Sequence, residues 1–373
     1  MMTSRQRVQA ALRREPTDRV PIFMWFHPET TQRLARELEI PPAAVAAVLG
    51  DDIRQTWVGN NASMEGVRLP HDGATYRDPW GITWVREGPF NQIRHSPLQG
   101  AEEAAVAAYR YPVEQIPALL SRLEPLLPSA GQYFLGVDVS PCAFEMVNRL
   151  RGMEDALLDL AANPDLAWRM AAAAADFAAR LAEAALRRYP CDWLWTGDDV
   201  GGQDGMLMSP DAWRELIKPH LARVVKVGAE HGVWVAYHSC GGIRPIIPDL
   251  IEIGVQVLNP IQGNCPGMDP LDLKREFGAR LAFMGGLDTQ GLLPRASAEE
   301  VFRATRRLIE GLTADGGGYI LAASHTVPPE TPLENIFAMY AAAGLSREAI
   351  LDAAAQARAA AAGGGAERRP GAR

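Results

Sequence analysis

Short β-rich apolar runs alternate with helical stretches along most of the chain, and this alternation limits the possible folds most strongly. Seven runs are clear, and a weaker eighth lies at 51–58. The clear runs cover residues 20–26, 132–139, 191–197, 232–239, 255–261, 280–287 and 317–324. Strands separated by helices indicate βαβ units and a mostly parallel sheet. Eight such units favour an α/β fold, a single-domain (β/α)8 TIM barrel, over an open sheet.

Signals at the ends of the helical stretches support this reading. The helix predicted from Ser209 begins with serine and proline, a typical N-cap followed by the first helical position, and ends at glycine. The helix predicted from Ser297 begins with a capping box, because Glu300 follows three residues later. A long alanine-rich amphipathic helix is predicted from Pro164. No G-x-G-x-x-G follows the first run, which counts against a dinucleotide-binding sheet.

Composition sets the boundaries and excludes some partners. The chain of 373 residues can build one large core, which we expect at 1–357, with a disordered low-complexity tail at 358–373. Its net charge of -8 argues against nucleic-acid and anionic-membrane partners. No apolar run has the roughly 20 residues of a membrane helix or resembles a signal peptide. We therefore expect a cytoplasmic protein with reduced cysteines.

An imidazole and a thiol stand two residues apart where the run 232–239 ends, at His238 and Cys240. In an extended chain, residues i and i+2 point to the same side, so both groups can bind one metal ion. Zinc suits mixed nitrogen and sulfur ligands, and catalytic zinc has three protein ligands and an open position. The predicted third ligand is His325, at the end of the last run, with Cys265 as the alternative. Without a metal, the pair would be a hydrogen-bonded histidine beside an inert thiol.

Other polar residues also follow the predicted strands, at the end where barrel enzymes carry their active groups. Asp198 and Asp199 end the run 191–197, and only one of the two can face a site, because neighbours in a strand point oppositely. We predict that Asp199 positions substrate, acts as a base or supports the metal, whereas Gly-Asp-Asp is also ordinary turn chemistry. Asp199 or Glu145 can also supply an oxygen ligand. Gln203, close behind, is a second catalytic candidate.

Several longer segments carry a family resemblance. They are "SRQRVQAALRREPTDRVPIFMW", "LRGMEDALLDLAANPDLAWRM", "GDDVGGQDGMLMSPDAWRELIKPHL", "YHSCGGIRPIIPDLIEIGVQVLNPIQ", "FMGGLDTQGLL" and "SHTVPPETPLENIFAMY". Together they resemble the uroporphyrinogen decarboxylase superfamily, which also contains the zinc-dependent methylcobamide:coenzyme M methyltransferases. The resemblance runs nearly end to end and implies a (β/α)8 barrel.

One departure from the family's motifs and one match to them indicate which branch of the superfamily the chain resembles. True uroporphyrinogen decarboxylases carry an arginine-rich "RQAGRY" after the first strand, where this chain reads "MWFHPETTQRL", with His27 and Glu29. Without those arginines the many carboxylates of a porphyrinogen would lie unpaired in the cleft, which is costly. The methyltransferase branch uses H-x-C and a distant Cys as zinc ligands. His238 and Cys240 match the first two, and His325 stands near the place of the third.

The resemblance to the methyltransferases implies that zinc binds a thiol substrate as thiolate, which takes a methyl group from a corrinoid. A partner protein would carry the corrinoid, because the chain has no D-x-H-x-x-G motif. Two alternatives stay open. One is a metal-independent decarboxylase (a lyase) for another acid, in which Asp52 or Asp199 stabilises a protonated intermediate. The other is a non-catalytic partner of a corrinoid protein.

The resemblance also implies a small-molecule substrate and pairing of two barrels as a homodimer. The substrate-binding candidates combine strand-end polar residues with residues of the first predicted strand and its loop. They are Trp25, His27, Asp138, Glu145, Asn259, Gln262 and Asp288.

Overall fold

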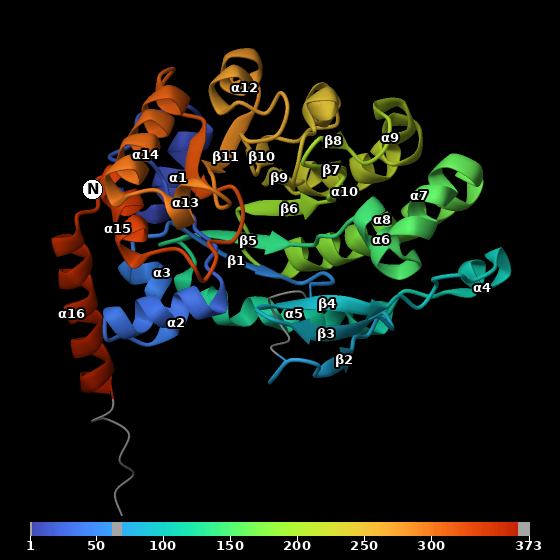
Figure 1. The fold of residues 1–373 in the computed structure, drawn as a ribbon, viewed down its shortest axis with the longest axis horizontal. Coiled ribbons are helices and arrows are strands. Elements are labelled where there is room, and N and C mark those ends of the chain that lie inside the picture. Colours follow the sequence, from blue (N-terminus) through green and yellow to red (C-terminus); the bar gives the residue numbers. More distant parts are fainter. Residues whose placement is uncertain (1, 62–68, 365–373) are drawn as a thin grey trace, which may run out of the picture. The chain divides into compact units, whose positions relative to one another are not determined.

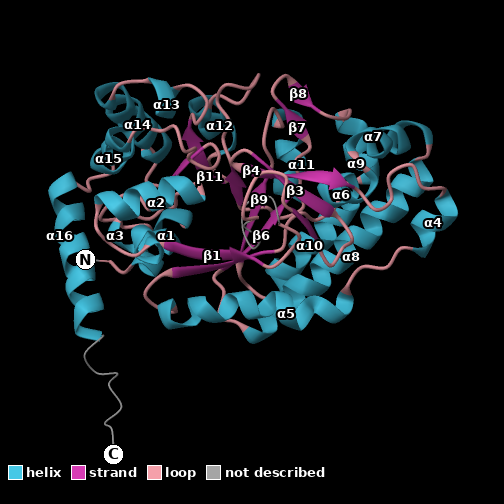
Figure 2. Cartoon of the chain, turned by 60° about the horizontal axis from the view of Figure 1, so that its bottom comes forward, coloured by secondary structure: helices cyan, strands magenta, loops and turns pink. Residues whose placement is uncertain are grey.

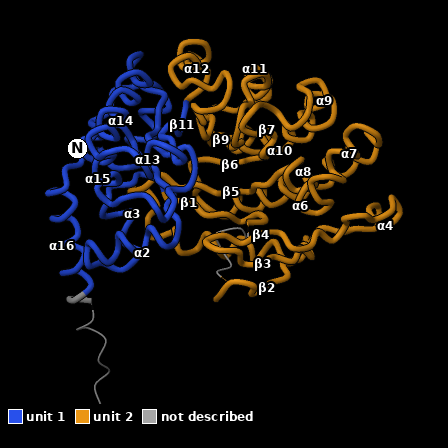
Figure 3. The backbone as a smooth tube through the Cα atoms, in the orientation of Figure 1, with its two compact units in different colours: residues 1–53, 283–373 blue, residues 54–282 orange. Residues whose placement is uncertain are grey.

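The predicted alternation of strands and helices is present in the structure. The computed structural model describes residues 2–61 and 69–364. The chain divides into two compact units, unit 1 with residues 1–53 and 283–373, and unit 2 with residues 54–282 (Figure 3). The boundary of one domain at 1–357 stays a prediction. No helix among the described residues is long and apolar enough to cross a membrane.

Unit 2 contains five strands that follow one another in a sheet (Figure 1). In spatial order they are β1 (Ile53–Trp57), β5 (Phe134–Asp138), β6 (Trp193–Gly197), β9 (Trp234–His238) and β10 (Val257–Asn259). From β5 to β10 each strand pairs with the next in parallel. Gly197 and Asn259 both align with His238, so β6, β9 and β10 end at the same level. Residues just beyond these ends are therefore neighbours in space.

The helices of unit 2 connect these strands, and their bounds follow the sequence signals closely. They are α4 (Glu103–Ala108), α5 (Ile116–Leu120), α6 (Phe144–Arg151), α7 (Met153–Ala162), α8 (Pro164–Arg188), α9 (Pro210–Leu216), α10 (Lys218–Glu230), α11 (Ile247–Glu252) and α12 (Pro270–Phe277), with the 3-10 helices η2 (Val113–Gln115), η3 (Ser121–Ser129) and η4 (Arg244–Ile246). The helix expected from Ser209 is two helices, because Pro219 lacks the N–H group that would continue α9. The long α8 packs along α10 through a face made mainly of alanine.

Two small antiparallel sheets in unit 2 were not predicted (Figure 2). One has β2 (Thr75–Arg77), β3 (Thr83–Glu87) and β4 (Phe90–His95), and the other is a hairpin of β7 (Gly201–Gly202) and β8 (Gly205–Met206). Their strands are short, two to six residues, and do not alternate apolar with polar side chains in the regular way that marks a half-buried strand.

Unit 1 has one pair of parallel strands, β11 (Ala282–Leu287) and β12 (Tyr319–Ala323), of which β11 begins at the last residue of unit 2. Its helices are α1 (Ser4–Leu12), α2 (Pro28–Glu37), the 3-10 helix η1 (Pro42–Ala44), α3 (Val45–Val48), α13 (Leu292–Arg295), α14 (Ala298–Thr313), α15 (Leu333–Ala342) and α16 (Arg347–Gly364). The capping box at the start of α14 is confirmed, because the Ser297 hydroxyl accepts from the Glu300 N–H and the Glu300 carboxylate accepts from the Ser297 N–H.

Helix α16 extends past the expected start of the tail at 358 and ends at Gly364. The helical conformation there has a simple reason, since residues 359–362 are all alanine, the best helix former. The rest of the predicted tail, 365–373, lies outside the described residues.

The run 20–26 was predicted as a strand but forms only two isolated parallel bridges. One links Ile22 with Leu321 in β12, and the other links Phe26 with Val327, beyond the end of β12. Side chains bond two other amides of the run. The Asp52 carboxylate accepts the Ile22 N–H at 2.9 Å, and the Asp51 carboxylate accepts the Met24 N–H at 3.2 Å. Those two amides are thus held by side chains, which explains why no continuous strand forms.

An ion pair between Asp18 and Arg7 predicts how unit 1 responds to acid. The Arg7 guanidinium donates to both Asp18 oxygens, at 2.6 and 3.0 Å, and lowers the pKa of that carboxyl to about 2. A lowered pKa means that the pair stabilises the folded state above pH 4 and that this stabilisation is lost as the pH falls toward 2. We expect D18N to cost about 1 kcal/mol at pH 7, given solvent screening, and nothing near pH 2. Urea unfolding at both pH values measures this, and an equal loss at both would contradict it.

Candidate metal centre

Asp199, His238 and Cys240 come together in unit 2 beyond the ends of β6 and β9. Their ligand atoms, one from each side chain, all lie within 4.8 Å of one another, and all three residues are half-buried. The strand register explains the meeting. Gly197 aligns with His238, and Asp199 and Cys240 each follow two residues after these partners. The parity argument from the sequence, which placed His238 and Cys240 on one side, thus gives the right geometry for this pair.

The distances within the cluster are short and the donor atoms differ in kind. The His238 Nε2 atom lies 3.6 Å from the Cys240 Sγ atom and 3.6 Å from the Asp199 Oδ1 atom. The Cys240 backbone N–H donates to Asp199 Oδ1 at 2.8 Å, which fixes the carboxylate. One nitrogen, one sulfur and one oxygen therefore converge, a set that a borderline-soft divalent cation such as zinc accepts.

The histidine is held in a defined orientation. Its Nδ1 atom lies 2.7 Å from the Asn259 Oδ1 atom, in the neighbouring strand β10, where Asn259 is buried. An amide oxygen only accepts, so Nδ1 carries the proton and Nε2 presents its lone pair toward Cys240 and Asp199. Metal-binding histidines are typically fixed by such a partner on the other nitrogen.

Further contacts support the other two members. The Asp199 N–H donates to the Glu145 Oε2 atom at 3.3 Å, and the other oxygen of Glu145 pairs with Arg149 at 2.5 Å. Beside Cys240, the Gly241 N–H donates to the Gln262 Oε1 atom at 2.9 Å. The cluster is thus bound into two neighbouring elements, α6 through Glu145 and the segment after β10 through Gln262.

Backbone packs directly on backbone where the loop 240–242 meets the β7–β8 hairpin. The Gly242 N–H donates to the Gly202 carbonyl at 3.0 Å. Gly241 has a φ of +82°, and a Cβ atom added there would lie 2.5 Å from the Gly201 carbonyl carbon. Only glycine fits such a conformation and such a close approach.

The carboxylates around the cluster raise the pKa of nearby acids. Burial raises the pKa of the Cys240 thiol well above its ordinary value, and the Asp199 and Glu145 charges add to that effect. Burial also raises the pKa of Asp198 to about 8, opposed by the N–H groups of Ala143 and Glu145, which donate to it at 2.8 and 3.0 Å. The site therefore favours a neutral thiol on its own, and a cation there would have to displace its proton.

The family of the chain follows from a match over its middle and C-terminal parts. Residues 139–344, more than half of the chain, match the uroporphyrinogen decarboxylase (URO-D) family. The chain belongs to the URO-D family. This confirms the resemblance found in the sequence, and the matched residues include all three members of the cluster.

Several proteins that are similar to this URO-D family member are methyltransferases. It is 24% identical over 349 residues to the methylcobamide:CoM methyltransferase MtaA of Methanosarcina barkeri, covering 91% of this chain and 97% of that protein. It is 22% identical over 272 residues to the methylated-thiol–coenzyme M methyltransferase of Methanosarcina mazei, covering 72% of this chain and 63% of that protein. The solved structure of a methyltransferase from Methanosarcina mazei superposes with a TM-score of 0.68 at 19% identity, covering 92% and 99% of the two chains, so the fold is shared.

Two predicted substrate-binding residues of the URO-D chain contact the ligand segment instead. Asn259 holds His238, and Gln262 holds the backbone beside Cys240, so both position the cluster. Asp138 lies at the end of β5, where its carboxylate accepts from the Ser140 N–H at 2.8 Å and from the Ser140 hydroxyl. These contacts give the three residues a structural role, and their roles in substrate binding stay predictions.

The remaining candidates of unit 2 lie at the edge of this arrangement. Gln203 is exposed at the tip of the β7–β8 hairpin, and its amide oxygen lies 3.8 Å from the Cys265 Sγ atom. Cys265 is buried and is not a member of the three-residue cluster. Glu145 lies next to Asp199, paired with Arg149, which the sequence analysis did not single out. Its i, i+4 spacing from Glu145 was the signal in the sequence that could have identified it.

Asp52 and the other candidates of unit 1 have mostly structural contacts. The Asp52 carboxylate is fully buried and binds Arg7 at 2.6 Å and Arg19 at 2.8 Å. Both oxygens are thus already paired with guanidinium groups, and a catalytic role of Asp52 stays a prediction. The buried His27 accepts the Glu29 N–H at the start of α2, at 3.2 Å.

Unit 1 also contains three other predicted site residues, Asp288, Trp25 and His325. The Asp288 carboxylate accepts the N–H groups of Gln290, Gly291 and Leu292 in the turn after β11, and its role as a substrate ligand stays a prediction. Trp25 is half-buried, and His325 is exposed in the loop after β12. The roles of Trp25 in substrate binding and of His325 as third ligand stay predictions.

Proposed function

We propose that this protein transfers a methyl group from a corrinoid, carried by a partner protein, to a small thiol. The observation that carries the proposal is the cluster of Asp199, His238 and Cys240, which can hold a thiol-activating cation. The relatives named above support it, since their names specify methyl transfer with methylcobamide, methylated thiols and coenzyme M. The protein is an enzyme of the methyltransferase type on this reading.

We further propose zinc as the ion, held by His238 Nε2, Cys240 Sγ and an Asp199 oxygen, with His325 as the candidate for a further ligand. The donor set fits, because nitrogen, sulfur and oxygen atoms converge within 4.8 Å. When bound, zinc lowers the pKa of a coordinated thiol, so that thiolate is available near neutral pH.

The residues of the chain have distinct tasks in this mechanism. Asn259 keeps the proton on His238 Nδ1 and so leaves Nε2 free to coordinate. The Cys240 N–H keeps the Asp199 carboxylate turned toward the cluster, and Glu145 holds the Asp199 backbone. The Glu145–Arg149 pair adds no net charge, so an approaching thiol meets a site whose ligands balance the cation.

The same proposal extends to the fold, the substrate, the source of the corrinoid and the location of the protein. We propose that the chain folds as a (β/α)8 barrel, supported by the shared fold of the Methanosarcina mazei methyltransferase. The substrate is a small molecule, the corrinoid comes from outside the chain, and the protein acts in the cytoplasm as a homodimer.

The two alternatives have less support. A metal-independent lyase would need Asp52 or Asp199 to face a carbon acid, but Asp52 is buried between two arginines and Asp199 belongs to the cluster. A non-catalytic partner would have no use for three convergent ligands fixed by buried hydrogen bonds. The methyltransferase proposal uses the cluster of three residues and does not need Asp52 to contact a substrate.

The direct test uses zinc-loaded protein, methylcobalamin as donor, and a panel of 2-mercaptoethanol, homocysteine and coenzyme M. The loss of the methylcobalamin absorption band and mass spectrometry of the thioether follow the reaction. We expect thiol methylation that depends on zinc and is absent in C240A. Zinc binding without methylation of any thiol, from either methylcobalamin or a methylated corrinoid protein, would contradict the proposal.

The hydrogen bond from His238 to Asn259 gives a prediction about metal affinity. N259L removes the acceptor, frees the imidazole to rotate and change tautomer, and should weaken zinc binding about 10- to 100-fold. N259D keeps an acceptor oxygen in the same place and serves as the matched control. Competition with a chromophoric chelator measures both affinities. Equal zinc affinity of N259L and the wild type would show that Asn259 does not orient the ligand.

A further inference from the structure

Helix α14 presents an aromatic side chain away from the core of unit 1. Phe302 is 39% exposed, although phenylalanine is among the residues most often buried. The core face of the helix is already filled by other side chains. These are Val301, Thr305, Leu308, Ile309 and Leu312. Packing within unit 1 therefore does not explain why Phe302 is apolar.

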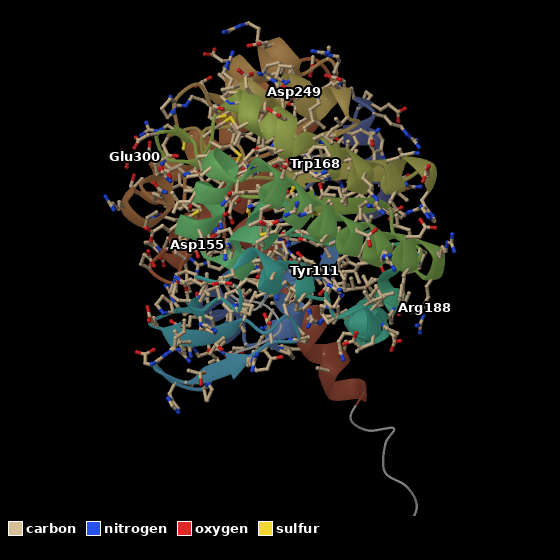
Figure 4. All side chains as sticks on the ribbon, turned by 90° about the vertical axis from the view of Figure 1, so that its right-hand side faces the viewer. Tyr111, Asp155, Trp168, Arg188, Asp249 and Glu300 are labelled. Atoms are coloured by element: carbon tan, nitrogen blue, oxygen red, sulfur yellow. The ribbon has the colours of Figure 1, made fainter. Side chains whose placement is uncertain are left out.

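The Phe302 side chain lines a groove of about 660 Å³. It is formed by α13, the residue that follows it, and the outer side of α14, all within unit 1. Its lining residues are Leu292, Ala296, Glu300, Phe302, Arg303, Ala304, Arg306 and Arg307. The labelled Glu300 lies at the surface (Figure 4). The volume is in the range of small-molecule sites, roughly 300–1,000 Å³.

The groove is positively charged, in contrast to the chain with its net charge of -8. Three of its lining residues are arginines and one is a glutamate, Glu300, whose carboxylate already accepts from Ser297 at 2.9 and 2.7 Å. The Arg303 pair with Glu299 is long, at 3.5 Å, and largely exposed, so it is weak. Arg307 forms no ion pair with any residue that the structure describes.

The arginines are also spaced for a shared ligand. Arg303 and Arg307 are four residues apart on one helix face, so both guanidinium groups can reach one anion. Guanidinium groups bind phosphate through paired hydrogen bonds, and an aromatic ring beside them offers a surface for stacking. Arg306 is engaged with Glu310 at 2.7 Å and is less available.

We propose that the α13–α14 groove binds an aromatic organic phosphate of the nucleoside diphosphate class. Arg303 and Arg307 hold the phosphates, and Phe302 stacks on the base. This site belongs to unit 1 alone and does not depend on the metal cluster or on methyl transfer.

The test is isothermal titration calorimetry of the full chain with ADP, adenosine and inorganic pyrophosphate. We expect ADP to bind with a Kd below about 1 mM, and more tightly than either half-ligand. R303Q/R307Q should weaken ADP binding at least tenfold. F302A should weaken ADP binding while leaving pyrophosphate binding unchanged, because it removes only the stacking surface.

Matched controls separate this site from general effects of charge. R275Q/R280Q removes two exposed arginines of unit 2, and C240A removes a member of the metal cluster; both should bind ADP as the wild type does. Absence of ADP binding at about 5 mM, or binding that survives R303Q/R307Q, would overturn the proposal. Equal binding of ADP and pyrophosphate would overturn the role of Phe302 and with it the aromatic class of the ligand.

Discussion

Replacing Cys240 with alanine is expected to remove zinc from the protein while leaving it folded. The thiol supplies the only sulfur among the three convergent donors, and without it only His238 and Asp199 of that set remain. Loss of a direct ligand should reduce affinity by more than the about 100-fold typical of a supporting residue. Metal analysis after zinc reconstitution should give about one zinc per wild-type chain and none in C240A.

Cys191 provides the matched control for this experiment. It lies just before β6, at the strand end opposite to Asp199, so C191A should keep its zinc. Circular dichroism and thermal unfolding of both variants show whether the fold is retained. If C240A unfolds and the wild type binds no zinc after reconstitution, His238 and Cys240 are structural residues and the proposed metal site is wrong.

Gly241→Ala is expected to have a comparably large effect without altering any ligand atom. The residue has a φ of +82°, which is unfavourable for alanine, and the new Cβ atom would lie 2.5 and 2.6 Å from the backbone of Gly201 and Gly202. Backbone cannot yield as a flexible side chain does, so the loop after β9 must move and displace Cys240. We expect a loss of about 3 kcal/mol in stability, together with loss of zinc.

Gly232→Ala separates the effect of a positive φ from the effect of a steric clash of the new Cβ atom. Gly232 also has a positive φ, +66°, but nothing lies within 4 Å of the place of its Cβ atom. Its replacement should cost only about 1 kcal/mol and leave zinc binding intact. Urea unfolding and metal analysis of both variants measure the difference. Similar behaviour of the two would mean that the contact with the β7–β8 hairpin is not needed for the site.

The strands and the proximity of His238 to Cys240 could be predicted because their signals are local. Every predicted run after residue 26 contains a strand, and His238 and Cys240 lie on the same side, as the two-residue period requires. The run 20–26 was the exception. Its amides at Ile22 and Met24 bond to carboxylates some 30 residues later, a contact that no local pattern reveals.

The contacts of supporting residues join distant segments, so the sequence alone could not identify them. Asn259 reads as a free polar residue at a strand end, but the register of β10 against β9 sets it opposite His238. Asp52 reads as an available acid until Arg7 and Arg19 are seen to enclose it. In both cases residue type and position were informative, whereas the partner was fixed only by tertiary pairing.

The glycine contact between the loop 240–242 and the β7–β8 hairpin has a consequence for how this protein can diversify. Because main chain alone makes that contact, the side chains at the hairpin tip, Gln203 and Asp204, carry none of the support for Cys240. Substitutions at 203 and 204 should therefore leave the backbone beside Cys240 in place. A saturation library at these two positions can thus vary the surface next to the cluster without disturbing it.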